Sequence, residues 1–433
     1  MVITGLWKFE KGSLSKRRHL CYKAYSLFMQ LYFTCFIVCL VMGLRDAIQP
    51  VEKIDALGII LFCVVMFIKV IICQRENIAQ ILTHIVKYDE KLDKLDKENL
   101  KIYYSIVRYN TIFCLTLFFF SGMCGVTLVF FKLVVYKHSL NQATLGLIND
   151  TEILKPLPYY IWRPIDYKEH YFAAFILDIV TASIGCTYNT STQIVYLTLL
   201  TFIIGQLKIL QVNFRNYGFV CSQKSTDKEK FYYLRNLIIE HQRIISFVKE
   251  LDDNMKYLLF LEFTINPIQI TSSLYEILVF KLDTMLPFRI TLLFCMMLQI
   301  FVLTWHANQI QIYSMGVSQA VYDSDWYDLP QRIKHHLLVI LMRAQKPLTL
   351  SVGPFFVLTN SAAVTVSTYY YCFYIIFNII IVQYPEPGKM TKERLNCILM
   401  FNTLSTLNWF RIDNVFVTLN KINVCLISSL NNL

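Results

Sequence analysis

Carboxylates inside long apolar runs are the side chains of this sequence most able to do chemistry. Asp178 is the only charged residue in the apolar run Tyr171–Leu207, and Glu262 and Glu276 both lie in the run Tyr257–Phe280. An acid placed within a membrane is costly, so it indicates a function by default. Asp178 could contact a polar ligand group or a partner on another helix. The alternative for Asp178 and Glu276 is a position close enough to the outer interface to be hydrated.

Catalytic and metal-binding patterns are missing from the sequence. His335 and His336 are adjacent, so their rings leave a helix on different faces and cannot share a metal as an i, i+4 pair would. No HExxH, GxSxG or phosphate-loop motif is present. The 13 cysteines are scattered, without a CxxC pair or a Cys/His cluster at zinc spacing. We therefore expect no enzyme, no cofactor and no metal site.

The composition predicts a membrane protein. Of 433 residues, 55% are hydrophobic and only 16% are charged, with a mean hydropathy of +0.46. A soluble domain of this length cannot bury so much apolar surface and still cover itself with polar groups. The net charge of +11 does not indicate a nucleic-acid partner, because the basic residues lie between the apolar runs, where membrane proteins carry them.

Seven apolar runs are long enough to cross a bilayer, which takes about 20 helical residues. They are too long for barrel strands and do not alternate strictly, which favours helices. The runs are Ala24–Leu44, Ala56–Cys73, Tyr109–Phe131, Tyr171–Leu207, Tyr257–Phe280, Ile290–Val321 and Leu348–Gln383. Lys69, near the end of the second run, is expected to extend its ammonium group to the interface.

The fourth and sixth runs exceed the thickness of the membrane. As one helix, Tyr171–Leu207 would be about 55 Å long, against about 30 Å of hydrocarbon. The excess is expected to extend into the cytoplasm. Glu229–Phe260 repeats apolar residues at helical spacing and predicts an amphipathic helix that continues into the fifth run. Glu262 would then lie near the cytoplasmic end of its span, paired with a base of this cytoplasmic part.

Lysine and arginine give the orientation. They are dense before the first run, between the second and third runs, and between the fourth and fifth runs, which predicts a cytoplasmic N-terminus. This is opposite to a G-protein-coupled receptor. The sequon Asn149-Asp150-Thr151 falls in the second outer loop, in agreement with this orientation, and makes Asn149 a candidate glycosylation site.

A dense aromatic and charged block precedes the last span. It contains Tyr322–Tyr327 (YDSDWY), followed by Leu329-Pro330, which can begin a helix. Gln331–Ala344 then predicts an amphipathic helix, with Ile333, Leu337, Leu338 and Leu341 on one side. Lys346-Pro347 ends it, so the seventh element is expected to split into a cytoplasmic half and a membrane half.

This block resembles the signature before the last span of insect odorant receptors. The matching residues are Tyr322–Tyr327, Leu329-Pro330 and the stretch Met342–Pro347 (MRAQKP). The resemblance covers roughly residues 20 to 377. Weaker matches elsewhere are Leu157-Pro158, Trp162, Pro164, His241-Gln242-Arg243, Phe247-Val248, Gln299, Trp305–Asn308, Ser367 and Tyr370. Ala307 stands where the family usually has glycine.

The resemblance implies a tetrameric cation channel in the plasma membrane of a sensory dendrite, opened directly by odorants. A variable subunit assembles there with a common odorant co-receptor as a heterotetramer. This chain lacks the insertion that marks the co-receptor, so it is similar to the variable, ligand-tuning subunits. Subunits of this family meet in the cytoplasmic platform. The expected contact residues here are Tyr322, Trp326, Tyr327, Pro330, Arg343, Lys346 and Pro347.

The same resemblance places an odorant pocket in the outer half of the membrane domain and a pore along the seventh helix. A small volatile ligand is bound by burial and shape, with one or two polar contacts. The candidate ligand contacts are Ile60, Leu61, Met123, Val126, Thr127, Phe130, Asp178, Thr181, Tyr188, Ser272, Ser273, Phe294 and Met297. The candidate pore residues are Val364, Thr365, Thr368 and Cys372. For each, ordinary packing is the alternative.

The expected fold class is thus an all-α membrane protein with seven spans. Its expected parts are a cytoplasmic N-terminus (1–23), six spans with loops (24–321), a cytoplasmic anchor (322–347), a pore-lining span (348–383) and an atypical tail (384–433). Two alternatives remain open. A gustatory-type channel shares the architecture, and a secondary transporter would show inverted repeats with paired broken helices; Pro267 could break the fifth span, but it has no counterpart.

Overall fold

The computed structural model describes most of the chain before residue 362. The described residues are 16–46, 50–74, 85, 96–145, 153–159, 161–163, 169–223, 226–279 and 284–361. The candidate pore residues Val364, Thr365, Thr368 and Cys372, the sequon at Asn149, the tail 384–433 and the side chain of Glu276 all lie outside them. The predictions for these residues therefore stay predictions.

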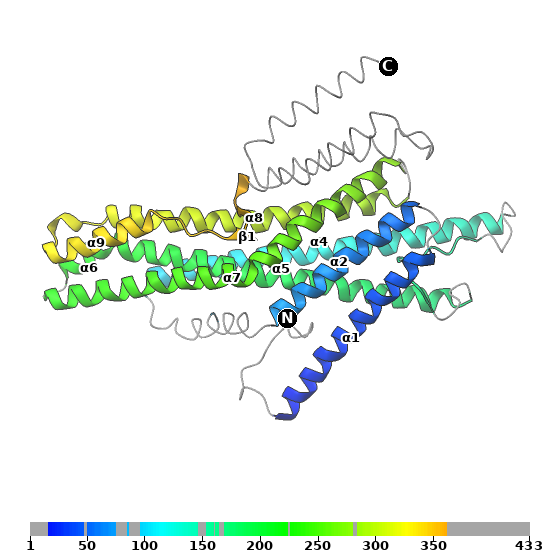
Figure 1. Cartoon of the computed structure of the whole chain (residues 1–433), viewed down its shortest axis with the longest axis horizontal. Coiled ribbons are helices and arrows are strands. Elements are labelled where there is room, and N and C mark those ends of the chain that lie inside the picture. The colour runs from blue at the N-terminus through cyan, green and yellow to red at the C-terminus, as the bar shows by residue number, and fades with distance from the viewer. Residues whose placement is uncertain are drawn as a thin grey trace, which may run out of the picture.

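The described part is almost entirely helical, which confirms the fold class expected from the apolar runs. The only strands among the described residues are a short antiparallel pair, in which Ser351 lies opposite Val357. Figure 1 shows the arrangement. The elements are α1 (Lys16–Asp46), α2 (Pro50–Cys73), α4 (Lys97–Thr144), α5 (Tyr171–Arg215), α6 (Tyr217–Ser222), α7 (Asp227–Val279), α8 (Leu286–Tyr322), the 3-10 turn η3 (Trp326–Asp328), α9 (Gln331–Ala344), β1 (Ser351–Val352) and β2 (Phe356–Val357).

Five of the described helices are long and apolar enough to cross a membrane. The stretches are Leu20–Arg45, Ala56–Cys73, Lys97–Thr144, Tyr171–Arg215 and Leu286–Tyr322. The fifth predicted span lies in the second half of α7. This segment is more polar than the five stretches above, because it contains Glu262 and nearby amide side chains. The seventh predicted span lies mostly beyond residue 361.

The long helices extend well past a bilayer, as expected for the fourth to sixth spans. α5, α7 and α8 have 45, 53 and 37 residues, or about 68, 80 and 56 Å at 1.5 Å per residue. Figure 1 shows α6 and α9 at one end of these extensions. α4 has 48 residues, so the expected third span Tyr109–Phe131 is only its central part. The extension was not predicted, because polar residues at both ends of the apolar run are not typical of a membrane span.

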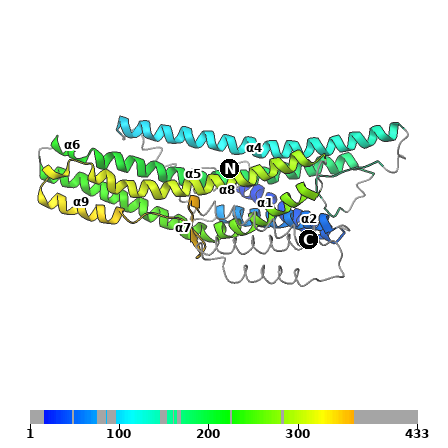
Figure 2. The ribbon, with the colours of Figure 1, turned by 90° about the horizontal axis from the view of Figure 1, so that it is seen from above.

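α5 lies at the centre of the molecule. Its buried residues lie on all of its sides, as in a helix that is surrounded by other helices. Tyr196, Leu199, Leu207 and Phe214 are completely buried. α4 covers one side, along the edge seen in Figure 2, and turns large apolar side chains such as Phe119 outward. That outward face suits contact with lipid.

α9 packs along α8 in the cytoplasmic anchor. Ile333, Leu337, Ile340 and Ala344 are buried, at the i, i+4, i+7, i+11 spacing of one helix face. Leu338 was expected on this face, but it is 53% exposed, because it lies one position, about 100°, away from Leu337.

The segment after α9 departs from the expected helix. The predicted membrane half of the seventh helix began at Leu348, whereas residues 348–359 form the β1–β2 hairpin and its flanks, and helix resumes only at residue 360. Asp252 of α7 accepts hydrogen bonds from the Ser351 backbone N–H (2.6 Å) and hydroxyl (2.8 Å). The Gly353 N–H donates to the Lys256 carbonyl at 2.8 Å. Gly353 turns the chain with a φ of 58°, which favours glycine.

Candidate functional site

A cavity of about 290 Å³ lies between α1, α2, α4, α5, α7 and α8. Lysine and arginine placement puts this half of the bundle on the outer side of the membrane. Its wall is mostly apolar and aromatic. Representative wall residues are Phe33, Phe62, Met66, Leu128, Ala182, Phe288 and Met296. Burial of an apolar body is therefore the main source of affinity that this site offers.

Four cysteines line the same cavity from four helices: Cys63, Cys124, Cys186 and Cys295. All four are free thiols, and the Cys295 thiol lies 3.4 Å from the Phe120 carbonyl oxygen, to which it donates. No group of three metal-ligating side chains occurs in the described part of the chain. The thiols thus act as small, polarisable wall groups.

The floor of the cavity is polar. α5 and α8 run inward from the outer side, whereas α7 runs outward, so the depth of each wall residue follows from its number. Asn189 on α5, Gln269 on α7 and Gln299 on α8 are the deepest wall residues of their helices. The Gln269 amide nitrogen donates to the Gly58 carbonyl at 3.1 Å. Three carboxamides therefore gather at the cytoplasmic end of an otherwise apolar cavity.

An ion pair lies beneath this floor, about two helical turns from Gln269 along α7. Lys69 Nζ of α2 is 2.8 Å from Glu262 Oε1 of α7, and their side chains are only 4% and 3% exposed. The Gln193 amide of α5 donates to the same oxygen at 2.7 Å. Two expectations were wrong: Lys69 does not reach the interface, and Glu262 pairs with a span residue rather than a cytoplasmic base. Buried ions keep their charge only when paired and hydrogen-bonded.

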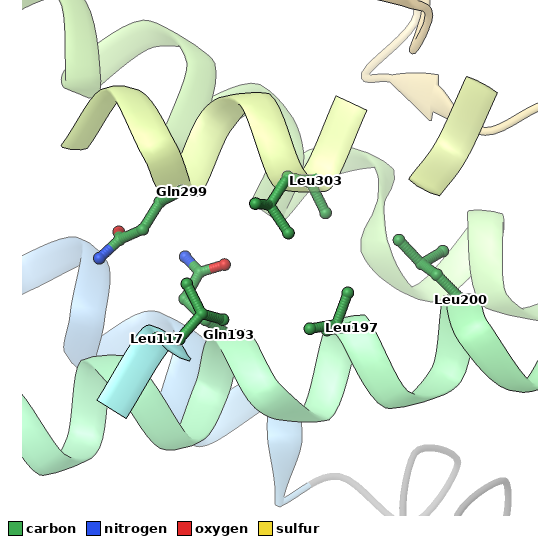
Figure 3. A pocket seen from close by; sticks show the side chains of 7 residues that line it. Leu117, Gln193, Leu197, Leu200, Gln299 and Leu303 are labelled. Carbon is green, nitrogen blue, oxygen red and sulfur yellow. The ribbon is translucent and has the colours of Figure 1, made fainter. Parts of the chain in front are cut away.

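A second, much smaller cavity of about 10 Å³ lies between α4, α5 and α8. It has room for about one water molecule. Figure 3 shows the amides of Gln193 and Gln299 at one end of it and Leu200 at the other. Because Gln299 also borders the large cavity, the two spaces share a polar wall.

The second outer loop covers the large cavity. Pro158 and Tyr159 form part of its wall. Arg163 Nη2 donates to both oxygens of Asp178, at 2.9 and 2.7 Å, and the Trp162 N–H donates to the Cys39 carbonyl at 3.1 Å. Asp178 is 1% exposed and does not border the cavity. Asp178 thus has a partner, but this partner is Arg163 of the second outer loop rather than a residue of another helix, as had been expected.

The structure brings only some of the candidate ligand residues to the cavity. Thr181, Ser272 and Ser273 line it. Tyr188 is buried against Phe33, with ring centroids 6.0 Å apart. Besides Tyr188 and Asp178, the candidates that do not line it are Ile60, Leu61, Met123, Val126, Thr127, Phe130, Phe294 and Met297. Several of these are exposed on the outer face of the bundle, because both faces of α4 and α8 are apolar and the sequence does not distinguish the inner one.

The expected subunit-contact residues form a surface at the cytoplasmic end. Tyr322 and Tyr327 are 63% and 61% exposed, and Trp326 is 38% exposed. Lys346 and Pro347 are also exposed, whereas Pro330 and Arg343 are half-buried. The Arg343 guanidinium donates to the Lys346 carbonyl at 3.3 Å. Their role in assembly stays a prediction.

Long apolar helices around a covered cavity are typical of a multi-pass membrane protein that can hold a small molecule. Residues 49–366, well over half of the chain, match the family described as 7tm Odorant receptor. The chain therefore belongs to the odorant receptor family.

Similar proteins come from several insects. Odorant receptor 10 of Aedes albopictus is 27% identical over 209 residues, which are 48% of this chain and 56% of that relative. Odorant receptor Or2 of Anopheles gambiae is 26% identical over 211 residues, covering 47% of this chain and 56% of that relative. The chain thus spans a little over half the length of these curated relatives.

The fold is also similar to a solved receptor. The olfactory receptor OR5 from Machilis hrabei in complex with eugenol superposes with a TM-score of 0.67 at 16% identity, over 86% of this chain and 94% of OR5. At this identity the likeness concerns the fold.

Proposed function

We propose that this chain is a ligand-tuning subunit of an odorant-gated cation channel. It binds a small volatile molecule in the 290 Å³ cavity and works as a heterotetramer with the odorant co-receptor in the plasma membrane. The observation that carries the proposal is this covered cavity, mostly apolar with a few polar groups, in a chain of the odorant receptor family. Such a site suits a small apolar ligand. OR5, which shares the fold, was solved with eugenol.

Two further parts of the proposal concern assembly and ion passage. The exposed aromatic residues Tyr322, Trp326 and Tyr327 contact neighbouring subunits in the cytoplasmic anchor. The seventh span lines the pore, with Val364, Thr365, Thr368 and Cys372 as the candidate residues. Apolar side chains there would gate by dewetting, and hydroxyls would ease the passage of cations.

The test is whole-cell current in cells that express this chain with and without an insect co-receptor, against a panel of volatiles. We expect a fast inward cation current that needs both chains and persists when G-protein signalling is blocked. Substrate uptake without conductance would contradict the channel and favour the transporter alternative.

A pair of cavity variants links the current to this site. Ala182 borders the cavity, so Ala182→Phe fills part of it, whereas Val180 is 47% exposed on the outer face and Val180→Phe leaves the cavity unchanged. We expect the first variant to lose the response to volatiles and the second to keep it, at equal surface expression. Equal responses from both would exclude this cavity as the ligand site.

A further inference from the structure

The floor of the cavity contains a hydrogen-bond acceptor whose identity is fixed by its surroundings. The two ends of a glutamine amide look alike, and only their partners tell them apart. One end of the Gln269 amide lies 3.1 Å from the Gly58 carbonyl oxygen, which can only accept. That end is therefore the nitrogen, and the other end is the oxygen.

This oxygen has no donor within the described part of the chain. Gln269 is 5% exposed, and its Oε1 is buried without a hydrogen-bond partner among the described residues. Asn189, on the facing helix α5, shows the same feature: it is 6% exposed, and its Oδ1 lacks a partner there. Buried carboxamide oxygens are nearly always paired, because an unpaired one is costly. Two such oxygens at the floor of one cavity indicate a donor that the described residues do not supply, such as a molecule bound in the cavity.

The charges around the cavity restrict what that donor is. Its described wall contains no aspartate or glutamate, and the two nearby acids, Asp178 and Glu262, are already paired with Arg163 and Lys69. A protonated amine would therefore be buried without a counter-ion, which is strongly unfavourable. The cations Lys132 and Arg289 border the outer end of the cavity, away from the amides, and both have interaction partners. The donor is thus neutral.

We infer that the cavity selects neutral ligands that carry a hydroxyl or N–H donor on an apolar body, and that Gln269 Oε1 accepts this donor. The inference rests on the proposed function and adds a specificity-determining residue to it. Asn189 provides a second amide on the opposite wall. The aromatic and sulfur-rich wall above the floor encloses the apolar body of the ligand.

Isomer pairs test this without any change to the protein. n-Octanol and heptyl methyl ether have the same atoms, and so do para-ethylphenol and para-methylanisole, but only the alcohol and the phenol can donate. In cells that express this chain with the co-receptor, we expect the donor isomer of each pair to be about tenfold more potent, because the ether leaves the buried acceptor unpaired. Equal potency within both pairs would overturn the inference and indicate that water satisfies the amides.

Variants then assign the preference to Gln269. Gln269→Met keeps the size of the side chain but removes the acceptor, so the two isomers should become equally potent. Met296 borders the same cavity without polar atoms, and Met296→Leu should shift both isomers alike and keep their ratio. Asn189→Leu is a second variant, to be used if Gln269→Met does not reach the cell surface. We expect it to reduce the potency ratio of the donor isomer to the ether. An unchanged ratio in a surface-expressed Gln269→Met receptor would overturn the assignment.

Different results would contradict the donor preference and the proposed function. Currents from ethers and alkanes as strong as those from alcohols contradict only the donor preference and leave the odorant-gated channel intact. Absence of current with every volatile, despite surface expression of both chains, contradicts the proposed function, and the inference falls with it.

Discussion

At the scale of single residues, the pair Lys69–Glu262 gives the sharpest expectation for stability. Both side chains are buried and lie 2.8 Å apart. Glu262→Ala leaves the Lys69 charge buried and unpaired, which costs about 3–5 kcal/mol. We expect a large fall in the thermal unfolding temperature of the purified receptor, measured by the fluorescence of a thiol-reactive dye, together with reduced surface expression.

The control for this pair is the double variant Lys69→Met with Glu262→Gln, which removes both charges and keeps similar volumes. Because no ion then remains unpaired, we expect it to be more stable than either single variant, as for other buried pairs replaced by neutral side chains. A double variant no better than Glu262→Ala alone would show that the two residues do not act as a pair.

His241 predicts how stability depends on pH. It is buried in the cytoplasmic part of α7, and burial, with a smaller effect of the nearby Arg343, lowers its pKa to about 4. In the unfolded chain the histidine pKa is about 6.5. Between about pH 6.5 and pH 4 the unfolded chain is therefore protonated at His241, whereas the folded chain is not. Protonation of His241 therefore leaves the free energy of unfolding unchanged above about pH 6.5. Between about pH 6.5 and pH 4 it lowers that free energy by about 3 kcal/mol in total.

The measurement is the unfolding temperature of purified receptor across this pH range, with His241→Phe as the comparison. Carboxylates also titrate in the lower part of the range, so the difference between the two proteins is the quantity that reports on His241. We expect the two curves to be parallel above pH 7 and the wild-type curve to fall faster below it. Parallel curves throughout would mean that His241 takes up its proton in the folded state.

The sequence predicted these residues unevenly, for a physical reason. Acids in apolar runs are rare, so Asp178 and Glu262 were visible as exceptions, but their partners were not, because pairing depends on how helices are placed in space. The floor amides Asn189 and Gln269 were missed, although an amide inside an apolar run is the same kind of signal in weaker form. Their neutral side chains cost less within a membrane and so attract less notice.

At the scale of elements, the turn η3 depends on a glycine of α6. A Cβ added at Gly218 would lie 2.8 Å from the Asp325 Cβ and 3.0 Å from its backbone nitrogen. Backbone cannot move aside as a side-chain end can, so Gly218→Ala should separate α6 from η3 at a cost of about 1–3 kcal/mol. Its control is Gly122→Ala on α4, where nothing lies within 4 Å.

Thermal unfolding and protease sensitivity of the two variants decide this prediction. We expect Gly218→Ala to unfold at a lower temperature and to be cleaved faster in the anchor, with Gly122→Ala unchanged or slightly more stable, since alanine favours helix over glycine. Equal behaviour of both variants would mean that the α6–η3 contact contributes little to stability.

Elements were easier to predict than their faces. The bounds of α9 were expected at Gln331 and Ala344, and the structure has both, because a proline, an amphipathic repeat and a second proline delimit this helix. The hairpin at 348–359 was interpreted as membrane helix because its composition is apolar. Its extended form depends on tertiary contacts that the sequence does not show, such as those with Asp252 and Lys256 of α7 and Ser314 of α8. The inner faces of α4 and α8 could not be assigned, because lipid and protein interior select the same side chains.

At the scale of the whole molecule, the distribution of exposed apolar side chains divides the chain into two environments. Along α4 and α8, exposed phenylalanines such as Phe119, Phe294 and Phe301 lie within the membrane-spanning part. Contact with lipid is enough to cover them. Tyr322, Trp326 and Tyr327 are exposed beyond the membrane, in the cytoplasmic anchor. A cluster of exposed aromatic residues in water is typical of an interaction surface, and its role in subunit contact stays a prediction.

Substitution within this cluster should therefore separate assembly from folding. Tyr327 and Tyr232 are both cytoplasmic tyrosines, 61% and 62% exposed, and Tyr327 alone belongs to the cluster. We expect Tyr327→Ala with Trp326→Ala to reduce the tetramer fraction at least tenfold in native size analysis of this chain co-expressed with the co-receptor, because aromatic residues contribute most at interfaces. Tyr232→Ala should leave that fraction unchanged. If both proteins assemble alike while their unfolding temperatures remain that of the wild type, the anchor contact lies outside η3. The next exposed apolar residues are then Leu338, Val339 and Met342 of α9.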